Sequence, residues 1–298
     1  MQKRHTHDRR RRPRLADPLH RITTRWRSGG VEQYPLSKDE THRALQRMGS
    51  GFEITHHRIR LDSLPEAFRG FRIIQLTDIH HGVFLPGEIL RHVVETVNDL
   101  KPDLVAVTGD FVTYSRAYIE PVSEILASVK ANHGVFAVLG NHDFRVGADE
   151  ISQSLESAGI EVLRNTHTRL RRRGQSLYLA GIDDWHYRPD LPRAIHGIPK
   201  DASTILLSHN PAIIRAAAKE NIGLVLAGHT HGGQVNLPFL GSIWGRTPEK
   251  LQFKIGWGRL GHTQIYVSRG IGTIVLPLRY RCPAEIPHLD LDSIHSAA

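Results

Sequence analysis

The chain has only one cysteine, Cys282, among its 298 residues. An internal disulfide is therefore excluded, and so is a structural zinc ribbon, which needs several thiolate ligands. We expect Cys282 to pack in the core rather than to act as a nucleophile. A chain so poor in cysteine is typical of a reducing compartment, and we expect a cytoplasmic location.

The sequence also lacks a long apolar run. A membrane-spanning helix requires roughly 18 to 20 apolar residues, and no segment approaches that length. The arginines at positions 9–12 are followed by Pro13, Arg14 and Asp17, where a signal peptide would place its apolar stretch. We therefore expect neither a spanning helix nor an export signal.

Acidic residues are scarce at the start of the chain. Residues 1–27 hold ten of the 39 Lys and Arg but only two of the 30 Asp and Glu, a charge of +8. The other 271 residues hold 29 basic and 28 acidic residues, so they contribute only +1 to the formal net charge of +9. Because the body of the protein is nearly neutral, we do not expect nucleic acid as a partner.

We assign residues 1–50 to a basic N-terminal tail and residues 51–298 to one folded domain. In the tail, apolar side chains recur at helical spacing between arginines: Leu15, Leu19, Ile22 and Trp26. One interpretation is a short amphipathic helix over 15–27 that lies on the anionic inner face of the cytoplasmic membrane. The other is a disordered basic arm. A second short helix is expected from Ser37, because Glu40 completes a capping-box pattern.

From about Phe52 the sequence alternates between apolar strands and helices, which is typical of a layered α/β domain. The expected strands are 71–76, 104–108, 135–139, 177–181, 204–207, 224–227 and 265–268. The expected helices are 86–100, 118–129, 148–157 and 212–219. Residues 164–173 are rich in arginine, and we expect a solvated hairpin or edge strand there.

Side chains suited to metal binding follow these strands in five short motifs. They are Asp78 and His80 in Thr-Asp-Ile-His, Asp110 in Thr-Gly-Asp, Asn141 in Gly-Asn-His-Asp, His209 in Ser-His-Asn-Pro, and His229 and His231 in Gly-His-Thr-His-Gly-Gly. Each motif alone has an ordinary explanation, such as a turn aspartate, a helix cap or a hydrogen-bonded histidine. Together, at the strand ends where open α/β sheets place their sites, they favour a pair of divalent cations suited to phosphoryl chemistry.

The five motifs resemble those of the calcineurin-like metallophosphoesterases, and the resemblance extends from about Phe52 to Leu291. It implies an α/β fold of four layers, an α-β-β-α sandwich with the site at the carboxyl ends of the strands. Further residues are similar to a bacterial branch that contains membrane-associated phosphodiesterases and a UDP-2,3-diacylglucosamine hydrolase: Lys101-Pro102-Asp103, Gln234, Ser268 to Gly272, Pro277-Leu278-Arg279 and Cys282 to Glu285.

The resemblance implies two metal ions. The ligands of one are Asp78, His80, Asp110 and His231. The ligands of the other are Asp110, Asn141, His209 and His229, so that Asp110 bridges the two ions. Such a pair lowers the pKa of a shared water, and the resulting hydroxide attacks phosphorus. The mixed oxygen and imidazole ligands suit manganese, which we expect, and also iron or zinc.

His142 is adjacent to a ligand but is assigned to neither metal. We expect it to stabilise the transition state or to protonate the leaving oxygen, with Asp143 orienting its ring. His81 is expected at the mouth of the site or on the surface. The roles of four further residues stay open. Asp183 and Asp184 either line the cleft or belong to a turn, and Arg269 and Arg279 are candidates for phosphate contact.

These features predict a metal-dependent hydrolase of phosphodiester or pyrophosphate bonds. Because the basic tail would bring the site to an anionic bilayer, we expect a lipid-linked nucleotide-sugar such as UDP-2,3-diacylglucosamine, and hence a role in lipid metabolism. A nucleotide or cyclic-nucleotide phosphodiesterase, or a nuclease, would use the same metals. A non-catalytic metal-binding scaffold is a third interpretation, although such proteins usually lose a ligand and none is missing here.

Overall fold

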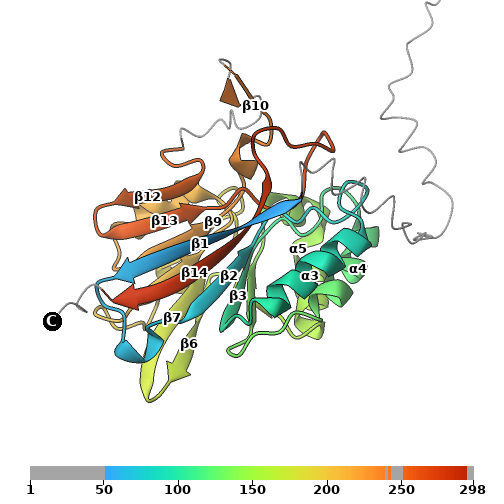
Figure 1. Ribbon diagram of the computed structural model, residues 1–298. Coiled ribbons are helices and arrows are strands. Elements are labelled where there is room, and N and C mark those ends of the chain that lie inside the picture. The colour runs from blue at the N-terminus through green and yellow to red at the C-terminus, as the bar shows by residue number, and fades with distance from the viewer. Residues whose placement is uncertain (1–50, 239–240, 243–250, 294–298) are drawn as a thin grey trace, which may run out of the picture. The chain divides into compact units, whose positions relative to one another are not determined.

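The computed structural model describes residues 51–238, 241–242 and 251–293 (Figure 1). The two helices expected in the tail, over 15–27 and from Ser37, lie outside these residues, and the boundary at residue 51 stays a prediction. The first described strand, β1, begins at Phe52. From there on, strands and helices alternate along most of the chain.

One sheet has six strands in the order β1-β14-β2-β3-β4-β5. Their bounds are β1 (Phe52–Leu61), β14 (Ala284–Ser293), β2 (Arg72–Leu76), β3 (Leu104–Thr108), β4 (Val135–Val138) and β5 (Glu161–Val162). Strands β2 to β5 are parallel, and β14 runs antiparallel to β2. Since β14 also pairs in parallel with β1, the two ends of the domain meet in this sheet.

The second six-stranded sheet has the order β12-β13-β9-β8-β7-β6. Its strands are β12 (Gly256–Leu260), β13 (Thr263–Val267), β9 (Leu224–Ala227), β8 (Thr204–Leu207), β7 (Gln175–Gly181) and β6 (Thr166–Arg172). The hairpin of β6 and β7 ends the sheet, which confirms the hairpin expected at the arginine-rich stretch. A further two-stranded ladder joins β10 (Asn236–Leu237) to β11 (Gly241–Ser242).

Helices cover the outer faces of both sheets. The α-helices are α3 (Gly87–Asp99), α4 (Ile119–Leu126), α5 (Asn141–Ser157), α6 (Leu191–Ala194) and α7 (Ile214–Ala217). Short 3-10 helices are η1 (Glu66–Phe68), η2 (Arg116–Tyr118), η3 (Pro211–Ile213) and η4 (His231–Gly233). Across the described ranges, none of the helices combines the length and apolarity that crossing a bilayer would require.

Three apolar clusters separate the layers, because successive residues of a strand point to opposite faces of its sheet. On β2, Ile74 packs with α3 and α4 in one cluster, whereas Ile73 belongs to the cluster between the two sheets. On β8, Leu207 joins that central cluster, whereas Leu206 packs with α6 and α7 in the third. Three cores imply four layers, so the expected α-β-β-α arrangement is confirmed.

Two parts of the fold differ from the expectation. Helix α5 begins at Asn141, seven residues earlier than the helix expected over 148–157, and Gly147 with φ 156° interrupts its helical geometry. The strands β1 and β14 were not expected. Charged side chains interrupt the apolar pattern of both segments. They are recognised as strands only because they pair with each other, although they lie at opposite ends of the domain sequence.

Candidate metal centre

The five motifs meet at one edge of the molecule. Three of them follow β2, β3 and β4 of the first sheet, and two follow β8 and β9 of the second. Because all five strands point their carboxyl ends toward the same edge, their loops converge over the seam between the sheets. The side chains brought together are Asp78, His80, Asp110, Asn141, His209, His229 and His231.

The backbone at this edge is strained. Five of the seven ligand candidates have φ between 49° and 72°, in the left-handed region that residues other than glycine rarely adopt: Asp78, His80, Asp110, His229 and His231. Such a conformation costs on the order of 1 kcal/mol or more per residue and persists only where the surroundings impose it. Its concentration here indicates that the fold stabilises a geometry for these side chains at the expense of local backbone preference.

Gly140, before Asn141, permits the close approach of two of the loops. A Cβ atom at this position would collide with the carboxylate of Asp110. Gly109 has φ +91°, which lets the chain turn directly after β3. The glycines of two motifs therefore allow Asp110 to lie beside the start of α5.

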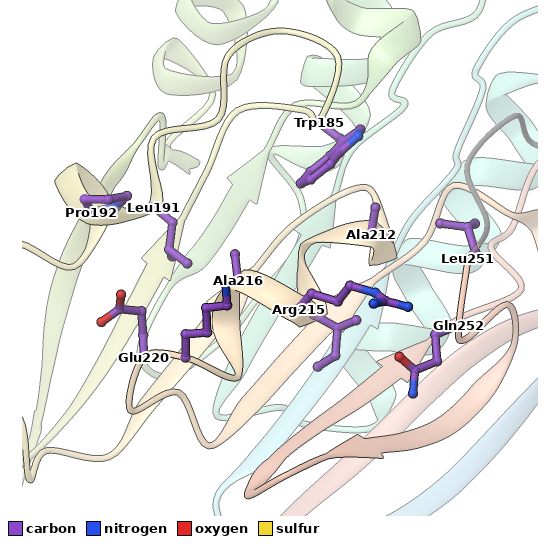
Figure 2. A pocket seen from close by; sticks show the side chains of 11 residues that line it. Trp185, Leu191, Pro192, Ala212, Arg215, Ala216, Glu220, Leu251 and Gln252 are labelled. Carbon is purple, nitrogen blue, oxygen red and sulfur yellow. The ribbon is translucent and has the colours of Figure 1, made fainter.

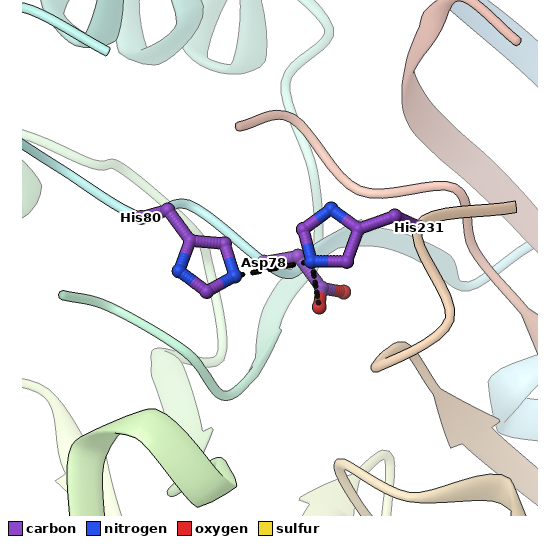
Figure 3. A group of neighbouring side chains, drawn as sticks. All are labelled: Asp78, His80 and His231. Carbon is purple, nitrogen blue, oxygen red and sulfur yellow. Dashed lines mark hydrogen bonds and ion pairs between the residues drawn. The ribbon is translucent and has the colours of Figure 1, made fainter. Parts of the chain in front are cut away.

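One group of potential ligands contains Asp78, His80 and His231 (Figure 3). Nε2 of His231 lies 3.2 Å from Oδ1 of Asp78 and 3.1 Å from Nε2 of His80. The two imidazole rings are stacked, with centroids 4.9 Å apart. All three residues are buried, so three ligand atoms face one small, dry volume.

The second group surrounds Asp110. Its Oδ2 atom lies 3.2 Å from Nε2 of His209 and 3.4 Å from Nε2 of His80. Nδ1 of His229 lies 3.2 Å from Nε2 of His209 and 2.9 Å from Oδ1 of Asn141. Asp110 therefore lies between the two groups, in contact with a ring from each.

The donor set fits cations. Two buried imidazole nitrogens that face each other at 3.1 Å can share one proton, and when both are unprotonated their lone pairs converge as those of two metal ligands do. Burial lowers the pKa of His80 to about 3 and that of His229 to about 4, and it places the pKa of His231 well below its usual range. These rings are neutral at pH 7 and their lone pairs are available to a metal.

Asp110 and His209 form an ion pair in the absence of a metal. Burial by itself raises the pKa of Asp110 and lowers that of His209, but mutual attraction and their hydrogen bond outweigh it. The pKa of Asp110 is thereby held well below its usual range and that of His209 well above it. Burial also raises the pKa of Asp78 to about 6. A divalent cation would replace the proton of His209 as the partner of these carboxylates.

His142 lies at the margin of the site and is 9% exposed. Its backbone N–H donates to Oδ1 of Asp110 at 2.9 Å, and its ring meets that of His80 edge to face at 5.0 Å. Nδ1 lies 3.1 Å from the carbonyl oxygen of Thr113, which leaves Nε2 for another partner. The structure thus places His142 beside the ligand groups, with one ring nitrogen held by the backbone.

Asp143 does not orient His142, which corrects the expectation. Its carboxylate accepts backbone N–H groups of Gly140, Asp110 and Phe111, each at 2.8 Å, and that of Val112 at 3.3 Å. The side chain is fully buried. Asp143 therefore joins the loop after β3 to the N-terminus of α5, and its contacts are those of a structural anchor.

His81 is also corrected, because it is 2% exposed and its Nδ1 lies 2.9 Å from the carbonyl oxygen of Leu85. Asp183 accepts hydrogen bonds from Arg164 and Asn165. Asp184 is fully buried and lies 2.9 Å from Nδ1 of His186.

The sequence reasoning missed His186, whose ring centroid lies 6.1 Å from that of His229. Its signal was a histidine two residues after an aspartate at a strand end, the same spacing as in the first motif.

The two arginines considered for phosphate contact are engaged within the protein. Arg269 pairs with Glu285 at 3.2 Å and with Glu53 at 2.8 Å. Arg279 is 5% exposed, and its guanidinium donates to backbone carbonyls, at 2.6 Å to that of Gly272. Cys282 is buried with its thiol against the carbonyl of His231, so the expected packing role is confirmed.

A surface hollow of about 470 Å³ lies along α6, η3 and α7, and none of the seven ligand candidates is among its lining residues (Figure 2). It begins at Trp185, which precedes His186, and continues along η3 and α7. Most of its lining is apolar, with the basic Arg215 and Lys219 and the acidic Glu220 among the lining residues.

Comparison with known proteins assigns the chain to a family. Residues 71–233 match the family model described as calcineurin-like phosphoesterase, which is more than half of the 298 residues. The chain is 34% identical over 246 residues to a Bacillus subtilis protein named uncharacterized metallophosphoesterase YkuE, covering 81% of this chain and 86% of that protein. It is 30% identical over 246 residues to phosphodiesterase YaeI of Escherichia coli, covering 80% of this chain and 88% of that protein.

A longer relative is the zebrafish transmembrane protein with metallophosphoesterase domain. Identity is 33% over 248 residues, which cover 78% of this chain but 56% of that protein. The match therefore covers only somewhat more than half of the relative's length. Together with the convergent ligand groups, these matches show that the chain belongs to the calcineurin-like phosphoesterase family and is a metal-dependent phosphoesterase.

Proposed function

We propose that the chain is a phosphodiesterase that holds two divalent cations at the seam between its sheets. The observation that carries this proposal is the convergence of seven oxygen and imidazole donors from five strand ends, of which six are buried and five have a left-handed φ. Asp110 supports two ions rather than one, because its Oδ2 lies within 3.4 Å of a ring nitrogen in each group. A shared carboxylate offsets the repulsion between neighbouring cations.

The proposed ligands of the first ion are Asp78, His80, Asp110 and His231. Those of the second are Asp110, Asn141, His209 and His229. Asp78 lies near both groups as well, but its Oδ2 already accepts the hydroxyl of Thr77 at 2.9 Å. This hydrogen bond fixes one face of Asp78, so we assign the bridge to Asp110.

When bound, two such ions would neutralise charge on the phosphate oxygens and activate a water for attack on phosphorus. The residues around them fix the geometry: Nδ1 of His209 lies 2.8 Å from the carbonyl oxygen of Thr108, which directs Nε2 toward Asp110. His142 is held at Nδ1, so its Nε2 can donate to the oxygen of the leaving group.

Metal reconstitution tests the proposal. Protein stripped with a chelator should not hydrolyse bis(p-nitrophenyl) phosphate, and manganese, iron or zinc added singly should restore turnover. We expect manganese to be the most effective. Protein that binds two ions per chain but hydrolyses neither an aryl phosphodiester nor a nucleotide-sugar pyrophosphate would contradict it.

For the physiological substrate we favour a lipid-linked or nucleotide-linked pyrophosphate such as UDP-2,3-diacylglucosamine. Residues 1–27 carry a charge of +8 and would attract the chain to anionic lipid. Removal of residues 1–27 should reduce binding to anionic vesicles while leaving hydrolysis of the soluble diester intact; unchanged vesicle binding would remove the support for a membrane substrate.

A further inference from the structure

Exposed apolar side chains concentrate on one segment between β13 and β14, residues 274–281, which we name the docking loop. Val275, Leu276, Leu278 and Tyr280 are each 40–44% exposed. Single exposed apolar residues are normal on a protein surface, but four within six positions form a patch, and such patches mark interaction sites. Figure 1 shows this segment in red at the top of the picture, near β10.

The docking loop is held in a defined shape. Gln234 is fully buried, and its side-chain amide donates to the carbonyls of Ile274 at 2.9 Å and Leu276 at 3.0 Å. Its Oε1 accepts the N–H of Ile274 at 2.9 Å. Val275, between these anchors, has φ 61°, which is rare for a β-branched residue. The structure therefore imposes the exposure of these side chains.

The base of the docking loop is joined to the metal centre. Arg279 donates to the carbonyl of His231 at 3.3 Å and to that of Arg269 at 2.7 Å. Just before the loop, the N–H of Gly272 donates to the carbonyl of Asp78 at 2.7 Å. His231 thus contacts the loop directly through Arg279, and Asp78 contacts Gly272, two residues before the loop, so that these bonds fix the apolar patch relative to the site.

The sequence around the patch is basic. Residues 251–284 contain five Lys and Arg and no Asp or Glu. Of these, Arg279 is buried, Arg269 pairs with Glu53 and Glu285, and Arg259 pairs with Gln264 at the far end of β12, so the exposed basic side chains near the patch are Lys254 and Arg281. Ile255 is 50% exposed. The hydroxyl of Thr230, which lies between His229 and His231, donates to the carbonyl of Lys254 at 2.6 Å. The segment 254–255 therefore extends the same surface on the other side of His231.

We propose that the docking loop inserts its apolar side chains into the headgroup region of an anionic bilayer, so that the metal centre faces phosphodiesters carried in the membrane surface. Aliphatic and tyrosine side chains beside arginines are the composition that binds such an interface. A second copy of this surface would meet it with like charge, and so would the basic residues 1–27, so neither fits the patch as well as anionic lipid. The proposal deepens the proposed function and rests on it.

A label at position 276 tests insertion in the full chain. An environment-sensitive fluorophore on Leu276→Cys should brighten and shift to the blue with vesicles of phosphatidylcholine and phosphatidylglycerol, and less with phosphatidylcholine alone. The matched control is Asp201→Cys, an exposed position before β8 and hence at the opposite edge of the sheet. The native Cys282 is 2% exposed, so unsubstituted protein measures background labelling. If the chain sediments with the vesicles but the label at 276 does not respond, tethering occurs elsewhere and the proposal is overturned.

The double variant Leu276→Asp/Leu278→Asp provides a second measurement. Both positions are exposed, so folding should be retained, and binding to the anionic vesicles should weaken by about tenfold. Hydrolysis of soluble bis(p-nitrophenyl) phosphate should stay unchanged, which separates this test from that of the proposed function. Unchanged vesicle binding would overturn the proposal, as would a change of oligomeric mass without any effect on vesicles, because the patch would then contact a second copy.

Discussion

The Oδ2 atom of Asp110 lies 3.2 Å from Nε2 of His209, and the two residues come from different sheets. Asp110 follows β3 of the first sheet, and His209 follows β8 of the second. Their pairing makes the metal centre a junction of the two halves of the sandwich. Changes at this junction should therefore affect metal binding and the stability of the fold as well as catalysis.

The bridging role of Asp110 predicts a large effect of Asp110→Asn. An amide cannot supply the shared negative charge, and a bound metal contributes several kcal/mol of transition-state stabilisation. Turnover of an aryl phosphodiester should therefore fall by roughly a thousandfold, and metal analysis should find fewer than two ions per chain. The exposed Asp62→Asn is the matched control; full metal content with full activity in Asp110→Asn would rule out the bridge.

Metal binding should stabilise the folded chain. Each ion at a hundred times its dissociation constant adds about 2.7 kcal/mol to the free energy of unfolding, which raises the melting temperature by roughly 5 to 10 °C for a domain of this size. Thermal melts of chelated protein with manganese added back measure this shift. The shift should be smaller in Asp110→Asn, and equal shifts in both proteins would place the ions elsewhere.

Metal binding should also release protons at pH 7. In the metal-free protein, Asp110 holds the pKa of His209 well above its usual range, so the ring is protonated and must lose its proton to bind a cation. Apparent affinity should therefore rise with pH. Below about pH 6, where Asp78 also takes up a proton because burial raises its pKa to about 6, affinity should fall further. Titration calorimetry in buffers of different ionisation enthalpy measures the release, and heats that are independent of the buffer would contradict it.

His142→Asn separates leaving-group chemistry from metal binding. If Nε2 protonates the leaving oxygen, turnover should fall by about 10²- to 10⁴-fold for an alkyl or nucleoside leaving group. The loss should be smaller for p-nitrophenolate, which needs no proton, and metal content should be unchanged. His92→Asn, on the exposed face of α3, serves as the control. An equal loss for both substrates would assign His142 to charge stabilisation instead.

The anchoring role of Asp143 predicts an effect on stability. In Asp143→Asn, the amide NH₂ would face backbone N–H groups that now bind carboxylate oxygens, so the free energy of unfolding should fall by about 3 kcal/mol. Urea denaturation of metal-free protein measures this change. Asp62→Asn should stay within about 0.5 kcal/mol of the unsubstituted protein. A variant as stable as the parent protein would contradict the anchoring role of Asp143.

Much of the fold was predictable, because its strands are short apolar runs that end at a glycine or a polar motif. The run from Leu104 to Thr108 is fully buried and was correctly predicted as a strand. The strand β1 was missed, since His56, Arg58 and Arg60 lie between its apolar residues. Its partner β14 begins 232 positions later in the register, at Ala284 opposite Phe52. Pairing at such a distance leaves no local signal.

The sequence by itself determined the composition of the site: which side chains can bind a cation, and that each follows a strand. It did not determine what each side chain contacts. His142 and Asp143 are neighbours in the chain, yet successive residues at the start of a helix point in different directions. One ring therefore lies beside the metal ligands while the next carboxylate turns to the backbone. The meeting of Asp110 with His209, and of the docking loop with His231, was decided only by the packing of two sheets, because contact between distant segments depends on the fold as a whole.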